Sequence, residues 1–126
     1  MREIKFRAWE KELKEMITVS TIDFIKGMIN TDSTWRYFHE VELMQYTGLK
    51  DKNGVEIYEG DILKCFNGSQ DKVGTVVHVC YDDTYTGYYP FNRDEVGFNT
   101  NSNSIEVIGN IYEHKHLLEE YKNENK

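Results

Sequence analysis

Residues 48–66, GLKDKNGVEIYEGDILKCF, contain the two sharpest turn signals of the chain and begin its most regular series of β-prone segments. Asn53-Gly54 is a pair that readily takes the positive φ angles of a tight turn. The triplet at residues 59–61, EGD, is a second turn, and it leads into a predicted strand at residues 62–66. Two turns this close together favour short antiparallel strands.

The segments that follow keep the same character. Residues 74–81, GTVVHVCY, form the most β-prone stretch, and period-two alternation places four of its side chains on one face: Thr75, Val77, Val79 and Tyr81. Three more short strands are predicted at residues 86–91, 95–99 and 104–111. Five short strands at roughly ten-residue spacing predict a small closed or nearly closed barrel.

The N-terminal part is also predicted to be rich in β-structure. Residues 4–8 alternate apolar and polar side chains, the charged residues 10–15 read as a turn, and residues 16–20 complete a hairpin. Two further strands are predicted at residues 22–29 and 35–39. The apolar spacing within residues 22–44 also fits a helix, so both alternatives remain open there.

The C-terminal end predicts a short helix. Residues 116–121, HLLEEY, have helical character, and the polar residues 122–126 are expected to fray.

Composition limits the class of protein. The chain has 126 residues, enough for one domain or two small subdomains that share a core. It lacks an apolar run long enough to span a membrane, and its alternating start does not resemble an export signal, so we expect a cytoplasmic protein. In a reducing compartment the only cysteines, Cys65 and Cys80, are expected to be buried, unpaired thiols.

The net charge of −7 lies in the second half of the chain. Residues 1–50 carry eight basic and eight acidic side chains, whereas residues 51–126 carry seven basic and fourteen acidic ones. Because a negative surface repels phosphate backbones, general nucleic-acid binding is disfavoured, although a local basic patch remains an alternative.

Three segments carry a family resemblance: MREIKFRAWE at residues 1–10, LMQYTGLKDKNGVEIYEGDILK at residues 43–64, and IEVIGNIYEH at residues 105–114. Together they resemble the YopX family of bacteriophage and prophage proteins. The resemblance implies a mainly β fold (α+β at the margins), with an N-terminal β-rich portion at residues 1–50. An SH3-like small barrel with a short C-terminal helix would occupy residues 51–126. It further implies a phage or prophage origin, a host-cytoplasmic location and a tendency to oligomerise, but no activity.

The residues of the central segment are interpreted as structural. Gly60 is expected to have a left-handed backbone, with Asp61 accepting hydrogen bonds from backbone amides and Glu59 exposed. The same interpretation, turn chemistry that positions strands, applies to Tyr46, Gly48, Asn53 and Gly54. The alternative is a functional site built on Glu59 and Asp61.

Other polar groups give weak signals. His114 and His116 are interpreted as an exposed polar turn, with a weak metal site as the alternative. Asp82-Asp83 and Asp94-Glu95 are read as turn residues, with acid–base or cation chemistry as the alternative. We therefore expect no catalytic residues, no cofactor and no metal, and we predict that the protein is not an enzyme.

A cluster of aromatic residues is the candidate interaction surface. Tyr85, Tyr88, Tyr89 and Arg93 lie between the two acidic pairs. Exposed tyrosines favour protein interfaces, while packing within a hairpin and stacking of single-stranded nucleic acid are the alternatives. The predicted function is a non-catalytic binding or assembly module that self-associates, or binds a host or phage protein. The alternative is a nucleic-acid-associated or DNA-mimicking regulatory factor.

Overall fold

The computed structural model of the chain describes residues 3–66, 73–83, 87–92 and 104–124. The chain divides into two compact units, residues 1–46 and 47–126, whereas the sequence placed the boundary after residue 50. The division falls within β6 (Val41–Lys50), a single ten-residue strand. Residues 41–50 are therefore extended, which decides between the helix and strand alternatives for this segment.

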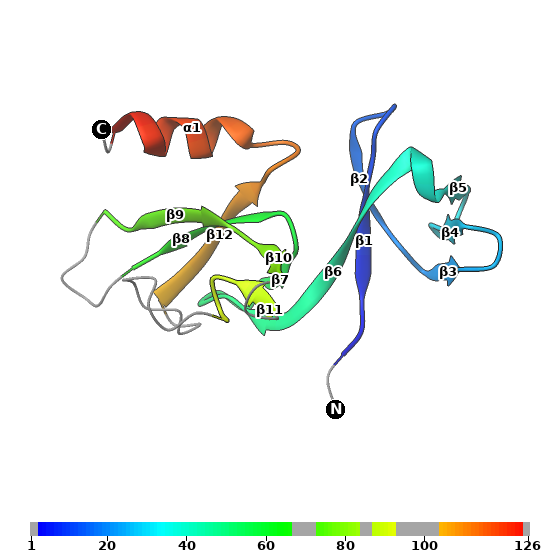
Figure 1. Cartoon of the computed structure of the whole chain (residues 1–126), viewed down its shortest axis with the longest axis horizontal. Helices are drawn as coiled ribbons and strands as arrows, with labels where there is room; N and C mark the ends of the chain where they lie inside the picture. Colours follow the sequence, from blue (N-terminus) through cyan, green and yellow to red (C-terminus); the bar gives the residue numbers. More distant parts are fainter. Residues whose placement is uncertain (1–2, 67–72, 84–86, 93–103, 125–126) are drawn as a thin grey trace. The chain divides into compact units, whose positions relative to one another are not determined.

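The first unit consists of short antiparallel strands (Figure 1). In chain order they are β1 (Phe6–Glu10), β2 (Glu15–Thr18), β3 (Thr21–Asp23), β4 (Met28–Asn30), β5 (Trp35–Tyr37), a 3-10 helix η1 (Phe38–Glu40) and the first half of β6. β1 pairs with both β2 and β6, and β3, β4 and β5 form a separate three-stranded sheet. The predicted N-terminal hairpin is confirmed.

A buried acid supports the turn of this hairpin. The carboxylate of Glu10, whose residue is 3% exposed, accepts hydrogen bonds from the backbone N–H groups of Glu12 and Leu13. The backbone N–H of Lys14, which has a positive φ of 56°, donates to the Glu10 carbonyl. The predicted turn at residues 10–15 thus forms around one side chain.

The predicted single strand at residues 22–29 is wrong, because the chain reverses in its middle. Gly27 has a φ of 66°, and the Asp23 Oδ1 atom accepts hydrogen bonds from the N–H groups of Ile25 and Lys26, both at 3.0 Å. This side-chain turn competes with the extended backbone that the apolar pattern predicted. It produces two short strands, β3 and β4, with Phe24 and Ile25 at the tip.

The second unit holds the remaining elements (Figure 1). They are β7 (Glu56–Tyr58), β8 (Asp61–Cys65), β9 (Thr75–His78), β10 (Cys80–Asp82), β11 (Gly87–Tyr89), β12 (Ile105–Asn110) and α1 (Lys115–Glu124). The central sheet has the order β12–β8–β9, and β10 and β11 form a hairpin. The short strands curl into a half-barrel, which confirms the mainly β prediction with a C-terminal helix.

Each unit has its own apolar core. In the first, Ala8, Ile29 and Val41 are buried. In the second, the buried residues are Ile57, Leu63, Cys65, Val79 and Ile105, and partly buried side chains pack against them.

Several predicted details of the second unit change. The stretch at residues 74–81 breaks into β9 and β10 at Val79, whose N–H donates to the Asp61 carbonyl at 2.8 Å, and Tyr81 is 49% exposed. The helix α1 continues to Glu124, past the point where fraying was expected. The strand predicted at residues 95–99 lies outside the described residues.

The turn at residues 51–55 is held by a buried carboxylate. The Oδ1 atom of Asp51 accepts hydrogen bonds from the N–H groups of Asn53 (2.8 Å) and Val55 (2.9 Å), and Oδ2 accepts one from Val107 in β12 (3.0 Å). Burial alone raises the pKa of the Asp51 carboxyl, but these three hydrogen bonds, with Lys52 nearby, lower it below its ordinary value. The charged carboxylate therefore stabilises the fold.

The second turn has the geometry predicted for it. Gly60 has a φ of 85°, and the Asp61 carboxylate, in a residue that is 2% exposed, accepts a hydrogen bond from the Tyr58 N–H at 2.8 Å. The positive φ of Gly60 is thus confirmed. Glu59 differs from expectation, since this residue is half-buried and not exposed.

The two cysteines differ in environment. Cys65 is buried and Cys80 is exposed, so the prediction that both are buried is wrong for Cys80. Burial raises the pKa of the Cys65 thiol to about 12. No disulfide joins the two within the part of the chain that the structure describes.

The first prediction concerns Gly60. Gly60→Ala should lower the free energy of unfolding by more than the roughly 1 kcal/mol of an ordinary Gly-to-Ala change, because alanine is strained at this φ. Denaturant unfolding measures the effect. Gly54→Ala, which also has a positive φ but faces open space, gives the cost of strain alone. A Gly60→Ala protein as stable as wild type would contradict the structural role.

The second prediction concerns Asp51. Asp51→Asn should destabilise the protein at neutral pH by about 1–3 kcal/mol, because the amide replaces one acceptor oxygen with a donor facing backbone N–H groups. The pKa of the Asp51 carboxyl is lower in the folded chain than in the unfolded chain. The stabilisation is therefore complete above the ordinary carboxyl pKa and is lost as the pH falls through the lowered pKa of the folded chain.

The difference in unfolding free energy between wild type and Asp51→Asn should therefore shrink from about pH 5 to about pH 3, as denaturant titrations at each pH would show. Asp83→Asn removes a carboxylate from an exposed turn and serves as the control. A constant difference across this range, or an equal effect of the control, would count against the charged role of Asp51.

The third prediction concerns the thiols. A small thiol reagent should label one group per native chain quickly, because Cys80 is exposed and Cys65 is buried with a raised pKa. Cys80→Ser should remove the fast phase and Cys65→Ser should retain it. Two fast groups would show that the region around Cys65 opens readily.

Candidate protein-binding surface

The three-stranded sheet β3–β4–β5 has one buried and one exposed face. Ile29 in β4 is fully buried, and Ile22 in β3 packs on the same core. The pairing register places Met28 opposite Tyr37 and Asn30 opposite Trp35. Because alternate residues of a strand point to opposite faces, Met28, Trp35 and Tyr37 lie on the face that points away from this core.

The exposed face is unusually apolar for a surface. Trp35 is 47% exposed and Tyr37 is 49% exposed, and the nearby tip of the β3–β4 turn exposes Phe24 at 77% and Ile25 at 99%. We call this the β3–β5 patch, and its residues are Phe24, Ile25, Met28, Trp35, Tyr37 and Phe38. Contiguous exposed apolar groups on a small protein mark interaction sites more often than isolated ones.

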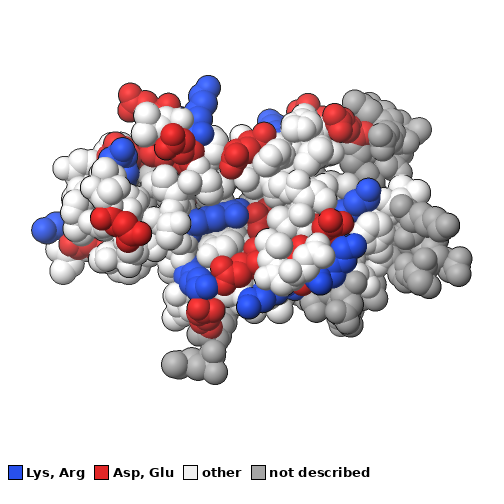
Figure 2. All heavy atoms as spheres, turned by 180° about the vertical axis from the view of Figure 1, so that it is seen from behind, with Lys and Arg blue, Asp and Glu red and all other residues white. Residues whose placement is uncertain are grey.

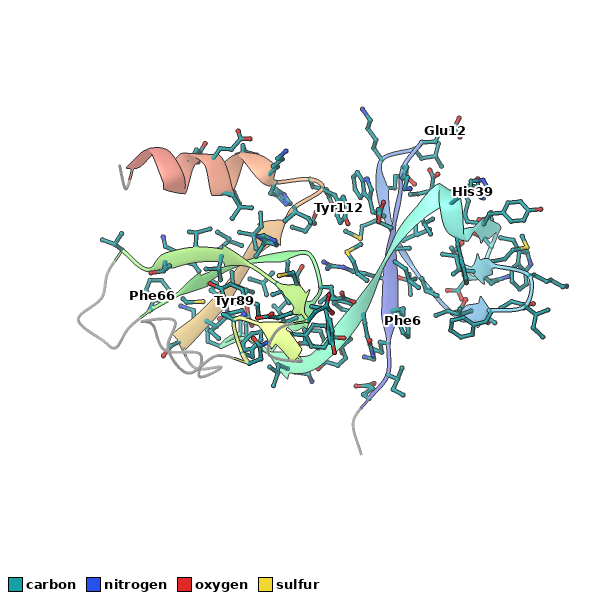
Figure 3. All side chains as sticks on the ribbon, viewed as in Figure 1. Phe6, Glu12, His39, Phe66, Tyr89 and Tyr112 are labelled. Carbon is teal, nitrogen blue, oxygen red and sulfur yellow. The ribbon has the colours of Figure 1, made fainter. Side chains whose placement is uncertain are left out.

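Ring contacts connect parts of the patch. The rings of Phe24 and Phe38 meet edge to face with centroids 6.3 Å apart, which joins the β3–β4 turn to η1. Tyr37 stacks on His39 at 5.5 Å, with only 11° between the ring planes, and Figure 3 labels His39 beside β5. The Tyr37 N–H also donates to the Glu40 carboxylate at 2.8 Å. These contacts hold the aromatic groups in place and reduce the entropy lost on binding.

A pocket opens beside this sheet. It has a volume of ≈ 270 Å³ and is lined by Lys26, Met28 and Trp35. Met28 and Trp35 belong to the patch, so this part of the surface is both apolar and indented.

The aromatic cluster proposed from sequence is only partly described. Tyr85 and Arg93 lie outside the described residues. Tyr88 is half-buried against the core of the second unit and contacts the Tyr81 ring edge to face at 5.7 Å. Tyr89 is half-buried in β11, opposite Cys80, as labelled in Figure 3. Tyr81, which contacts this cluster, is 49% exposed and thus more exposed than Tyr88 or Tyr89.

The signature residues of the central segment lie in turns and in the core. Tyr46 is 3% exposed, with the Lys5 ammonium 5.7 Å from its ring centre. Gly48 and Gly54 have positive φ angles, and the Asn53 N–H is held by Asp51. Glu59 and Asp61 surround the Gly60 turn. Gly48, Gly54 and Gly60 thus supply positive φ angles, and the Asp61 carboxylate holds a backbone N–H.

The sequence predicted that His114 and His116 lie in an exposed turn, and this prediction is wrong for His114. His114 is half-buried, and its Nδ1 atom accepts a hydrogen bond from the Asn110 N–H at 3.1 Å. Its ring lies so close to Gly109 that a Cβ there would come within 2.7 Å. His116 is exposed. Within the described residues no group of three His, Cys, Asp or Glu side chains could hold a metal ion.

The acidic pairs are also placed in part. Asp82 lies in β10 opposite Gly87, and Asp83 is in an exposed turn. Asp94 and Glu95 lie outside the described residues.

Basic and acidic side chains are interspersed on the face shown in Figure 2, and no large basic area is visible there. Ion pairs support this: Lys5 with Glu3 at 3.2 Å, Lys11 with Glu42 at 3.3 Å, and Lys52 with Glu106 at 3.7 Å. No described helix is long and apolar enough to span a membrane.

Sequence reasoning missed the β3–β5 patch. The available signal was the alternation Trp35-Arg36-Tyr37 after a turn-rich segment, which predicts a two-faced strand. Reading residues 22–29 as one strand hid the β3–β4 turn. The exposure of Phe24 and Ile25 therefore became visible only in the folded chain.

Comparisons with known proteins agree with this architecture. The chain matches the YopX protein family over residues 5–119. It is similar to the crystal structure of protein EF1440 from Enterococcus faecalis, with a TM-score of 0.68, 29% sequence identity, and coverage of 94% of this chain and 99% of that one. No match was found among curated proteins. Because the family match spans nearly the whole chain, this protein belongs to the YopX family.

Proposed function

We propose that this chain is a non-catalytic binding and assembly module that contacts another protein through the β3–β5 patch. The observation that carries the proposal is the exposure of Phe24, Ile25, Trp35 and Tyr37 on one small sheet and its turn. Aromatic side chains offer large contact areas at low entropic cost and dominate protein interfaces. The partner is a host or phage protein, in keeping with the family.

A protein partner suits this surface better than a nucleic acid. Single-strand binders combine stacking aromatics with a groove of cations that follows the phosphates. Residues 21–40, which form this sheet and its turns, carry two cations, Lys26 and Arg36, against three carboxylates, Asp23, Asp32 and Glu40, and the chain has a net charge of −7. Long-range repulsion would therefore oppose a polyanion.

Self-association is the form of this binding that the purified chain can show alone. A patch that lacks its natural partner can pack against the same patch of a second copy, which gives a closed two-fold dimer. Burying several aromatic groups per copy would supply the favourable free energy. This is the proposed basis for a homo-oligomer.

The fourth prediction tests the patch. Wild-type protein at tens of micromolar should form a defined oligomer, and Ile25→Ser should shift it towards monomer, because Ile25 is 99% exposed and contributes to contacts between copies only. Sedimentation velocity or light scattering measures the mass.

Leu13→Ser is the matched control, since Leu13 is 58% exposed at another turn of the same unit. Both variants should melt close to wild type. An oligomer unaffected by Ile25→Ser, or equally weakened by Leu13→Ser, would show that the patch is not the contact surface. A wild-type monomer at this concentration would end the proposal of self-association.

A further inference from the structure

The pocket beside the β3–β5 patch offers donors and an apolar wall but few acceptors. Its volume of ≈ 270 Å³ is at or below the lower end of small-molecule sites, so it suits part of a chain, such as one large side chain, better than a whole cofactor. Met28 supplies a thioether that adapts to different shapes. Trp35 supplies a ring and an indole N–H.

The polar groups of this pocket are available for a ligand. Within the described residues, the Lys26 ammonium makes no ion pair, and the Trp35 indole N–H makes no hydrogen bond. The nearest acid in sequence, Asp23, uses its Oδ1 atom to hold the turn through the N–H groups of Ile25 and Lys26. Arg36 lies on the opposite face of β5, opposite Ile29 in the pairing register, and donates to the Trp35 carbonyl through Nη1 at 3.0 Å.

We propose that this pocket receives an acidic, apolar peptide segment of the partner protein. A large apolar side chain would lie against Met28 and Trp35, and a neighbouring carboxylate would pair with the Lys26 ammonium. The charges match a single carboxylate rather than an acidic run, because Lys26 is the charged residue that lines the pocket while Asp23, Asp32 and Glu40 belong to the same segment of the chain. This inference rests on the proposed function and specifies the chemistry of the partner.

A test needs an unbiased set of ligands, because the chemistry of the pocket does not specify the partner's sequence. Display of random short peptides on the immobilised full chain supplies one. Wild type should enrich peptides in which Asp or Glu lies beside Phe, Leu or Trp. Lys26→Glu should lose this enrichment, and Lys26→Arg should retain it, since arginine keeps the charge.

Lys115→Glu is the matched control, because it makes the same change of charge at an exposed position of α1 in the other unit. It should keep the enrichment. The best peptide, labelled and followed by fluorescence anisotropy, should bind Lys26→Glu about tenfold more weakly than wild type. Trp35→Ser should also weaken it, while circular dichroism confirms that each variant is folded.

The opposite outcomes are clear. No acidic–apolar enrichment, or equal losses in Lys26→Glu and Lys115→Glu, would overturn the inference. Tighter binding of labelled oligo-dT than of any acidic peptide would assign the pocket to nucleic acid instead. If Ile25→Ser weakens the oligomer but no acidic peptide binds, the proposed function stands and this inference is wrong. If the peptide binds but Ile25→Ser leaves the oligomer unchanged, only the proposal of self-association is wrong.

Discussion

The fold of the second unit depends on the carboxylate of Asp51. It accepts hydrogen bonds from the N–H groups of two residues in its own turn and of Val107, which lies far along the chain in β12. The Lys52 N–H adds a bond to the Ile105 carbonyl at 3.0 Å. Because β12 changes register between Val107 and Gly109, backbone donors at that point need an acceptor from outside the ladder. A buried charge is stable here only because these donors surround it.

Similar capping interactions continue along β12 and beyond. The Asn110 Oδ1 atom accepts hydrogen bonds from the N–H groups of Tyr112 and Glu113, and the Asn110 N–H donates to His114. Gly109 leaves room for the His114 ring, which no larger residue would allow without movement. These bonds guide the chain from the sheet into α1, which lies across the β8–β9–β12 sheet in Figure 1. In the central and late segments that resemble the YopX family, Asp51 and Asn110 thus make several hydrogen bonds to the backbone.

The candidate binding surface follows a different physical rule. Ile29 and Ile22 cover one face of the β3–β4–β5 sheet, and the other face keeps Trp35, Tyr37 and Met28 near the solvent. The part of these aromatic side chains that stays exposed adds no hydrophobic stabilisation to the chain alone, since it remains hydrated in the folded state. Their contribution would come from a partner that removes them from water. The hydrogen-bonded turns around Asp51 and Asn110 and the proposed binding surface thus lie in different sequence segments.

The sequence by itself determined the local features: the turns at Asn53-Gly54 and Gly60, the N-terminal hairpin, the mainly β class and the short C-terminal helix. Each follows from backbone preferences or periodicity within a few residues, which are legible without the fold. The tertiary structure decided what depends on distant contacts. In the folded chain Cys80 is exposed and His114 is half-buried. Asp51 accepts a hydrogen bond from the distant Val107 N–H, and residues 22–29 divide into two strands around Gly27. Burial is a property of the whole packed chain. The sequence therefore could not assign Trp35 to an exposed face, or to the pocket that it lines with Lys26 and Met28, because that depends on which face of the sheet the core covers.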